Sequence, residues 1–82
     1  MRLKIEIPVE IYDGLLDNCD KTSEEYTTLK NGLIVRHPQN NDVRLVQILC
    51  EQNAAGRLLT FAQLVDPTAA QKIVSSVHFP SG

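Results

Sequence analysis

The chain has 82 residues, a formal net charge of −2 and 43% hydrophobic residues. This hydrophobic content excludes an intrinsically disordered chain, and a chain of this length forms one domain with a thin core. The slight excess of acidic residues argues against binding a phosphate backbone through overall charge, although a local basic patch would still permit it. We expect a single globular domain over residues 1–82, with residues 78–82 as a short C-terminal tail.

The sequence predicts a cytoplasmic protein without membrane attachment. No apolar run approaches the length of about 20 residues that spans a bilayer. Residues 1–8 alternate charged and apolar side chains, whereas a signal peptide carries a continuous apolar run. Cys19 and Cys50 are far apart and belong to no zinc-binding motif. We expect both to be buried free thiols, with a disulfide as the alternative.

The chain opens with a pattern typical of a half-buried strand. In residues 2–7, apolar and charged residues alternate, with Leu3, Ile5 and Ile7 on one face and Arg2, Lys4 and Glu6 on the other. Pro8 ends this strand and suits the start of a helix. Residues 9–20 follow a helical period, with Ile11, Leu15 and Cys19 four residues apart.

The opposite face of this predicted helix is acidic. Its carboxylates recur every three or four residues, at Glu10, Asp13, Asp17, Asp20 and Glu24. Such a stripe is typical of a solvated helix face. The alternatives are a docking surface for a basic partner and a divalent-cation site, although the glycine-centred order of an EF-hand loop is absent.

The middle of the chain suggests a β-meander. Tyr26, Thr27 and Thr28 favour a strand over residues 24–29, and Asn31-Gly32 is a strong signal for a tight hairpin turn. A strand over residues 33–35 and a polar loop over residues 37–42 follow. Residues 43–50 are compatible with a helix or a strand, and we favour a strand because of their β-branched residues.

The last third is predicted to hold a connection, a strand and a helix. Residues 52–56 form the connection, and residues 58–65 form a strand that is apolar on both sides. Asp66 and Pro67 suit the N-cap and the first position of a helix over residues 68–77.

These elements predict an α+β fold, a small two-layer domain with an antiparallel β-sheet. The expected order is strand, helix, β-meander and helix, with two helices on one face of the sheet. The strands at residues 43–50 and 58–65 are apolar on both sides, so the second face of the sheet needs a cover. We expect a second copy of the chain to provide that cover, as a homo-oligomer, with the tail or a long loop as the alternative.

No motif predicts catalysis, a cofactor or a metal site. His37 and His78 stand beside no recognisable nucleophile motif, and the four glycines are scattered rather than gathered in a phosphate-binding loop. We therefore expect no catalytic residues, no cofactor and no metal. An enzyme assembled from residues distant in sequence is the remaining alternative.

Two patterns relate to DNA binding. The alternating strand, Pro8, Glu10 and the apolar positions up to Cys19 resemble the opening half of a ribbon-helix-helix DNA-binding domain. The resemblance implies that Arg2, Lys4 and Glu6 face the major groove and that a second helix completes the dimer, whereas the predicted strand at residues 24–29 occupies the place of that helix. If residues 43–50 were helical, residues 42–77 would instead suit a helix-turn-helix, with Lys72 as the one basic residue of its recognition helix.

The sequence therefore predicts a small, non-catalytic, self-associating binding module. The alternative is a dimeric DNA-binding regulator of the antitoxin or repressor kind. The candidate binding residues are Arg36, His37, Arg44 and Arg57, because the predicted turns would gather several of them into a basic patch at one edge of the sheet.

Overall fold

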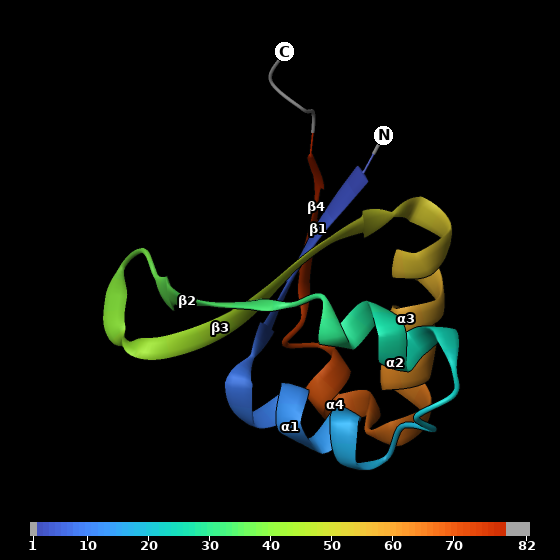
Figure 1. The fold of residues 1–82 in the computed structure, drawn as a ribbon. Coiled ribbons are helices and arrows are strands. Elements are labelled where there is room, and N and C mark those ends of the chain that lie inside the picture. The colour runs from blue at the N-terminus through green and yellow to red at the C-terminus, as the bar shows by residue number, and fades with distance from the viewer. Residues whose placement is uncertain (1, 79–82) are drawn as a thin grey trace.

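The computed structural model describes residues 2–78 and has an α+β fold, as predicted, with a four-stranded antiparallel sheet and four helices on one side of it (Figure 1). The elements are β1 (Arg2–Pro8), α1 (Val9–Asp17), α2 (Glu24–Lys30), β2 (Leu33–His37), β3 (Asn40–Glu51), α3 (Gln52–Val65), α4 (Pro67–Ala70) and β4 (Val74–His78). This order differs from the predicted strand, helix, meander and helix. Among the described residues, no helix has the length and apolar character needed to cross a membrane.

The strands lie in the order β2-β3-β1-β4, and each pairs antiparallel with its neighbours. The N-terminal strand β1 is thus an inner strand, between β3 and β4. Its residue Ile5 lies opposite Ile48 of β3 and Ser75 of β4. Strands distant in sequence therefore form the middle of the sheet, and β2 and β4 form its two edges (Figure 1).

The core lies between the sheet and the helices. The sheet contributes Ile5 and Ile7 from β1 and Val46 and Ile48 from β3, all at most 1% exposed. The helices contribute Leu15 from α1, Leu29 from α2, Ala55, Leu58 and Ala62 from α3, and Ala70 from α4. Fully burying an aliphatic side chain of the size of Ile or Leu stabilises a fold by roughly 1.5–3 kcal/mol, so this layer is the main source of stability.

Residues 24–29 form helix α2, so the predicted strand there is wrong. The Ser23 hydroxyl accepts a hydrogen bond from the Tyr26 amide, 3.2 Å away, and thereby caps the helix. Glu24 and Glu25 occupy its first turn, where negative charge favours the helix dipole. This capping, together with burial of Leu29, outweighs the β propensity of the tyrosine and threonines.

The predicted hairpin turn at Asn31-Gly32 is also wrong, because this pair ends helix α2. Asn31 is the C-cap, and its amide donates to the Thr28 carbonyl. At Gly32 a Cβ atom would collide with the Val46 side chain and would lie 3.2 Å from the Ile48 side chain. Glycine is therefore required here by close approach to the core, since its φ angle is not positive.

Residues 52–65 form helix α3, and neither the predicted connection nor the predicted strand is present. Ala55, Leu58 and Ala62 recur at steps of three and four residues, which places them on one buried face. Leu59, Phe61 and Leu64 lie on other parts of the helix surface and gave the segment its two-sided apolar pattern. Gly56, in the interior of the helix, has open space around the position that a Cβ atom would take.

The predicted helix at residues 68–77 is confined to α4. Asp66 caps it as expected, since its carboxylate accepts hydrogen bonds from the amides of Thr68 and Ala69. The chain then leaves the helix and forms β4, which pairs with the free side of β1. The β-branched residues Val74 and Val77 favour this extended conformation, and pairing with β1 provides its hydrogen bonds.

The remaining predicted strands and the first helix are present, with changed bounds. The strands at residues 2–7, 33–35 and 43–50 are present, and β3 begins earlier, at Asn40, so the predicted loop at residues 37–42 is shorter. Helix α1 ends at Asp17 rather than at residue 20. His78 belongs to β4, and the rest of the predicted tail lies outside the described residues. Because residues 43–50 are extended, the helix-turn-helix alternative is excluded.

Candidate functional site

The side of the sheet that faces away from the helices, which we call the open face, is the most extensive candidate site. Strand alternation places Ile5, Ile7, Val46 and Ile48 against the helices and their neighbours on the other side. The open face consists of Arg2, Lys4 and Glu6 from β1, Leu33 and Val35 from β2, Leu45, Gln47 and Leu49 from β3, and Val74 and Ser76 from β4. No helix within residues 2–78 covers it (Figure 1).

Four side chains of β2 and β3 form an apolar patch on the open face: Leu33, Val35, Leu45 and Leu49. Leu33 is 70% exposed and Leu49 is 42% exposed. Val35 lies directly opposite Leu45, whose exposure is 9% although it does not belong to the core cluster. The apolar patch therefore holds large aliphatic groups that the helices do not cover.

The centre of the open face is polar and carries both signs of charge. Lys4 and Glu6 are successive outward residues of β1, and Gln47 of β3 lies opposite Glu6. Across the sheet, one row runs from Leu33 through Gln47 and Glu6 to Val74, which is 58% exposed. The open face thus combines an apolar patch at the β2 side with a lysine and a glutamate beside it.

The structure gathers three of the four predicted binding residues. Arg36 of β2 lies directly opposite Arg44 of β3, and both are exposed. His37 adjoins them, and its Nδ1 accepts a hydrogen bond from the Gln39 amide at 3.1 Å. Among the described residues neither arginine forms an ion pair. These three residues form a small basic group in the β2–β3 hairpin, and their role in binding stays a prediction.

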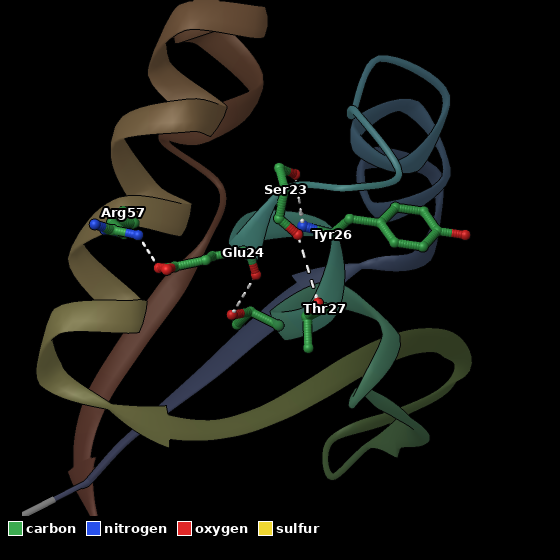
Figure 2. A network of polar contacts seen from close by, with 6 residues as sticks. Ser23, Glu24, Tyr26, Thr27 and Arg57 are labelled. Atoms are coloured by element: carbon green, nitrogen blue, oxygen red, sulfur yellow. Dashed lines mark hydrogen bonds and ion pairs between the residues drawn. The ribbon is translucent and has the colours of Figure 1, made fainter.

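Arg57 lies apart from this basic group, on helix α3. Its guanidinium forms an ion pair with Glu24 of α2, as Figure 2 shows. Glu24 and Arg57 also line an open groove of about 1070 Å³ between α2 and α3, together with Glu51, Phe61 and the 80% exposed Leu64. The sequence did not predict this groove, because it lies between two helices whose residues were predicted to form strands.

A smaller crevice of about 340 Å³ lies between α1 and the α3–α4 region. Small residues on both sides, including Gly14, Ala62 and Ala69, keep the helices from filling this space. Glu10 and Asp66 stand among its lining residues, but Asp66 already caps α4 through its carboxylate. The crevice is therefore explained by the small side chains at a helix contact.

The predicted acidic stripe is divided in the structure. Because α1 ends at Asp17, Asp20 lies in the following turn, where its carboxylate accepts hydrogen bonds from the amide and hydroxyl of Thr22. These bonds lower the pKa of Asp20, the amide contributing most. Glu24 belongs to α2 and pairs with Arg57. Within residues 2–78, no three His, Cys, Asp or Glu side chains gather as a metal site would require.

Both cysteines are free thiols, as predicted, although each is half-buried rather than buried. The Cys19 sulfur lies 3.4 Å from the Ser23 hydroxyl. Burial, and to a lesser extent the charge of Glu51, raises the pKa of Cys50. A raised pKa disfavours the reactive thiolate, so Cys50 has the character of a structural thiol.

The position of β1 conflicts with the ribbon-helix-helix resemblance. A second helix, α2, does follow α1, in contrast to the predicted strand. However, β1 is flanked by β3 and β4, so Arg2, Lys4 and Glu6 lie within a four-stranded sheet. The major groove is about 12 Å wide and admits a two-stranded ribbon, whereas strands spaced about 4.8 Å apart make this sheet too wide to enter it.

The comparisons with known proteins add no relative. The chain matches no protein-family model, and no curated protein or solved structure shows significant similarity to it. The functional argument therefore depends on the surfaces of the fold itself.

Proposed function

We propose that the protein is a self-associating interaction module in which the open face packs against the same face of a second copy. The observation that carries the proposal is the apolar patch, where Leu33 is 70% exposed although it lies on a regular strand. An antiparallel sheet with one solvated face normally places polar side chains on that face. Here β2 and β3 place leucine and valine there instead.

The small size of the domain supports a need for additional burial. A chain of 82 residues buries a smaller fraction of its surface than a larger domain does. Covering an exposed leucine contributes up to roughly 1.5–3 kcal/mol, and a symmetric dimer covers the apolar patch of both copies. Sheets that pack face to face lie about 10 Å apart, which allows the leucines of two copies to interdigitate.

The charges on the open face favour a second copy as the occupant. A two-fold axis that reverses the strand direction would place Lys4 of one copy near Glu6 of the other, and the reverse pair would form by symmetry. Both residues are half-buried in the sheet. A partner that covers them would therefore need a negative group near Lys4 and a positive group near Glu6. The face is thus complementary to itself in charge as well as in apolar character.

The test is the solution mass, measured by light scattering coupled to size exclusion, of the wild type and of Leu33→Asp. We expect the wild type to have at least twice the chain mass of 9.2 kDa. Leu33→Asp should lower this mass, because it places a carboxylate within the apolar contact. Leu64→Asp is the matched control, since Leu64 is 80% exposed on α3 and lies outside the open face.

The controls separate this proposal from its alternatives. A mass that is unchanged between low and high salt is expected for an apolar interface, whereas an interface dominated by ion pairs weakens with salt. A monomeric wild type at every concentration would contradict the proposal. So would a Leu33→Asp variant that keeps the wild-type mass while Leu64→Asp loses it. Circular dichroism should show that both variants are folded.

A further inference from the structure

Strand β4 is a short edge strand without the charges, proline or bulge that discourage pairing at many sheet edges. It forms one border of the sheet, and its other side pairs with β1. Its sequence, Val-Ser-Ser-Val-His, contains no lysine, arginine, carboxylate or proline, and its pairing with β1 has no bulge. Among the described residues, no backbone hydrogen bond joins its outer side to another segment. An unprotected edge of this kind offers a row of amide and carbonyl groups to another strand.

The opposite edge, β2, differs in its charge and in the regularity of its pairing. The edge strand β2 carries Arg36, which lies opposite Arg44 of the inner strand β3. The register of β2 with β3 shifts between Arg36 and His37, and Pro38 follows directly. Charges, bulges and proline are the features by which natural sheets discourage pairing at an edge. Within residues 2–78, the sheet therefore carries these protective features at the β2 border and not at the β4 border.

We infer that β4 pairs antiparallel with β4 of a second copy and joins two sheets into one of eight strands. A copy of β4 suits this edge because the strand contains no lysine, arginine or carboxylate, so none of these charges would meet its own kind across a two-fold axis. If the axis passes at Ser76, Ser75 lies opposite Val77 of the other copy and Val74 lies opposite His78. Val74 and Val77, which are 58% and 49% exposed, would then gain cross-strand neighbours.

This interface is distinct from the open-face contact and does not depend on it. Edge pairing extends the sheet sideways, whereas the open-face contact stacks two sheets. Directly opposite residues of an antiparallel pair have Cα atoms about 4.5–5.5 Å apart, but stacked sheets are about 10 Å apart. A disulfide requires Cα atoms within about 7 Å, so a cysteine at residue 76 distinguishes the two arrangements.

The experiment uses the full chain with Cys19→Ser and Cys50→Ser, to which Ser76→Cys is added. After mild oxidation with oxidised glutathione, we expect a covalent dimer on a non-reducing gel, present at low protein concentration and removed by reductant. Arg36→Cys in the same background is the matched control at the protected edge, and it should stay monomeric. Absence of a dimer in Ser76→Cys, or equal dimer in the two variants, would overturn the inference.

A second variant tests pairing at the β4 edge without a covalent cross-link. Ser76 lies opposite Lys4 of the same chain, so Ser76→Glu gains an intramolecular partner and should keep the domain folded. The two-fold axis would place the new carboxylates of two copies against each other and lower the association constant by at least tenfold. Adding Leu33→Asp to the Ser76→Cys chain should leave the cross-link intact. Loss of the cross-link there would show that the edge depends on the open face and would contradict the inference.

Discussion

The two faces of the sheet carry similar apolar residues but differ in what covers them. Ile48 and Leu49 are adjacent in β3, yet Ile48 is 0% exposed beneath the helices and Leu49 is 42% exposed on the open face. All four helices contribute to the core on the first face, and none within residues 2–78 reaches the second. Hydrophobic sequence alone therefore does not determine burial in this protein, and the helices decide which face becomes the core.

The largest expected effect separates the two faces directly. Ile48→Ala should lower the free energy of unfolding by about 2–5 kcal/mol, because it leaves a cavity among fully packed side chains. Leu49→Ala should change the stability of the monomer by about 0.5 kcal/mol or less, since Leu49 has no core contact to lose. Urea denaturation at a protein concentration below the range of self-association measures both. Equal losses would show that the open face is packed in the monomer.

The division into faces was predictable from sequence only where the strands form a regular alternation. Residues 2–7 show the two-residue period clearly, and β1 follows it. The apolar pattern of residues 43–50 correctly indicated a strand with apolar side chains on both faces, since Ile48 faces the helices and Leu49 faces the other way. The same reasoning failed for residues 58–65, which form part of helix α3. A helix with a wide apolar face has apolar residues at both odd and even positions, so it resembles a strand that is apolar on both sides.

The other errors arose where a local signal had two meanings. An Asn-Gly pair occurs in hairpin turns and also at helix C-termini. Here the Ser23 cap at the other end of α2 favours the helix. Strand β4 could not be recognised locally, since its hydrogen bonds come from β1 at the other end of the chain. The candidate binding residues show the same contrast between local and distant signals. Arg36, His37 and Arg44 lie within one hairpin that the sequence indicated, whereas the position of Arg57 is set by helix α3, which the sequence did not predict.

The second prediction concerns Gly32, where the backbone lies close to the buried side chains of β3. Gly32→Ala should lower the free energy of unfolding by about 1–3 kcal/mol, because the new methyl group would collide with the buried Val46. Gly56→Ala is the matched control in an exposed part of α3, where nothing obstructs a methyl group, and it should stabilise by up to about 1 kcal/mol. Thermal and urea denaturation should give these opposite signs. A neutral Gly32→Ala would mean that the core near Val46 is loosely packed.

The third prediction tests the turn that leads from the helical layer to the exposed edge. Asp66→Ala removes the acceptor for the amides of Thr68 and Ala69 and should cost about 1 kcal/mol. Asp66→Asn keeps a side-chain oxygen and should retain most of the stability. Hydrogen exchange should show whether the loss also reaches β4, which follows this turn. If Asp66→Ala matches the wild type, the cap does not stabilise α4.

The smallest effect concerns a hydrogen bond between helices α1 and α2. The Tyr12 hydroxyl of α1 donates a hydrogen bond to the Leu29 carbonyl of α2, so Tyr12→Phe should cost about 1 kcal/mol near neutral pH. Burial first, then the charge of Asp13 and the neighbouring Tyr26, raises the pKa of Tyr12 above its ordinary value of 10.0. The folded state thus favours the neutral phenol. Its contribution is complete below the ordinary pKa and is lost as the pH rises through the raised pKa.

The stability difference between wild type and Tyr12→Phe should therefore be constant from neutral pH to about pH 9 and should narrow above pH 10. Urea denaturation of both proteins across this range measures the difference. A difference that stays constant above pH 10 would show that the Tyr12 phenol ionises equally well in the folded and unfolded chains. The hydroxyl would then face solvent instead of joining α1 to α2, and the covered layer would depend on apolar packing alone at this contact.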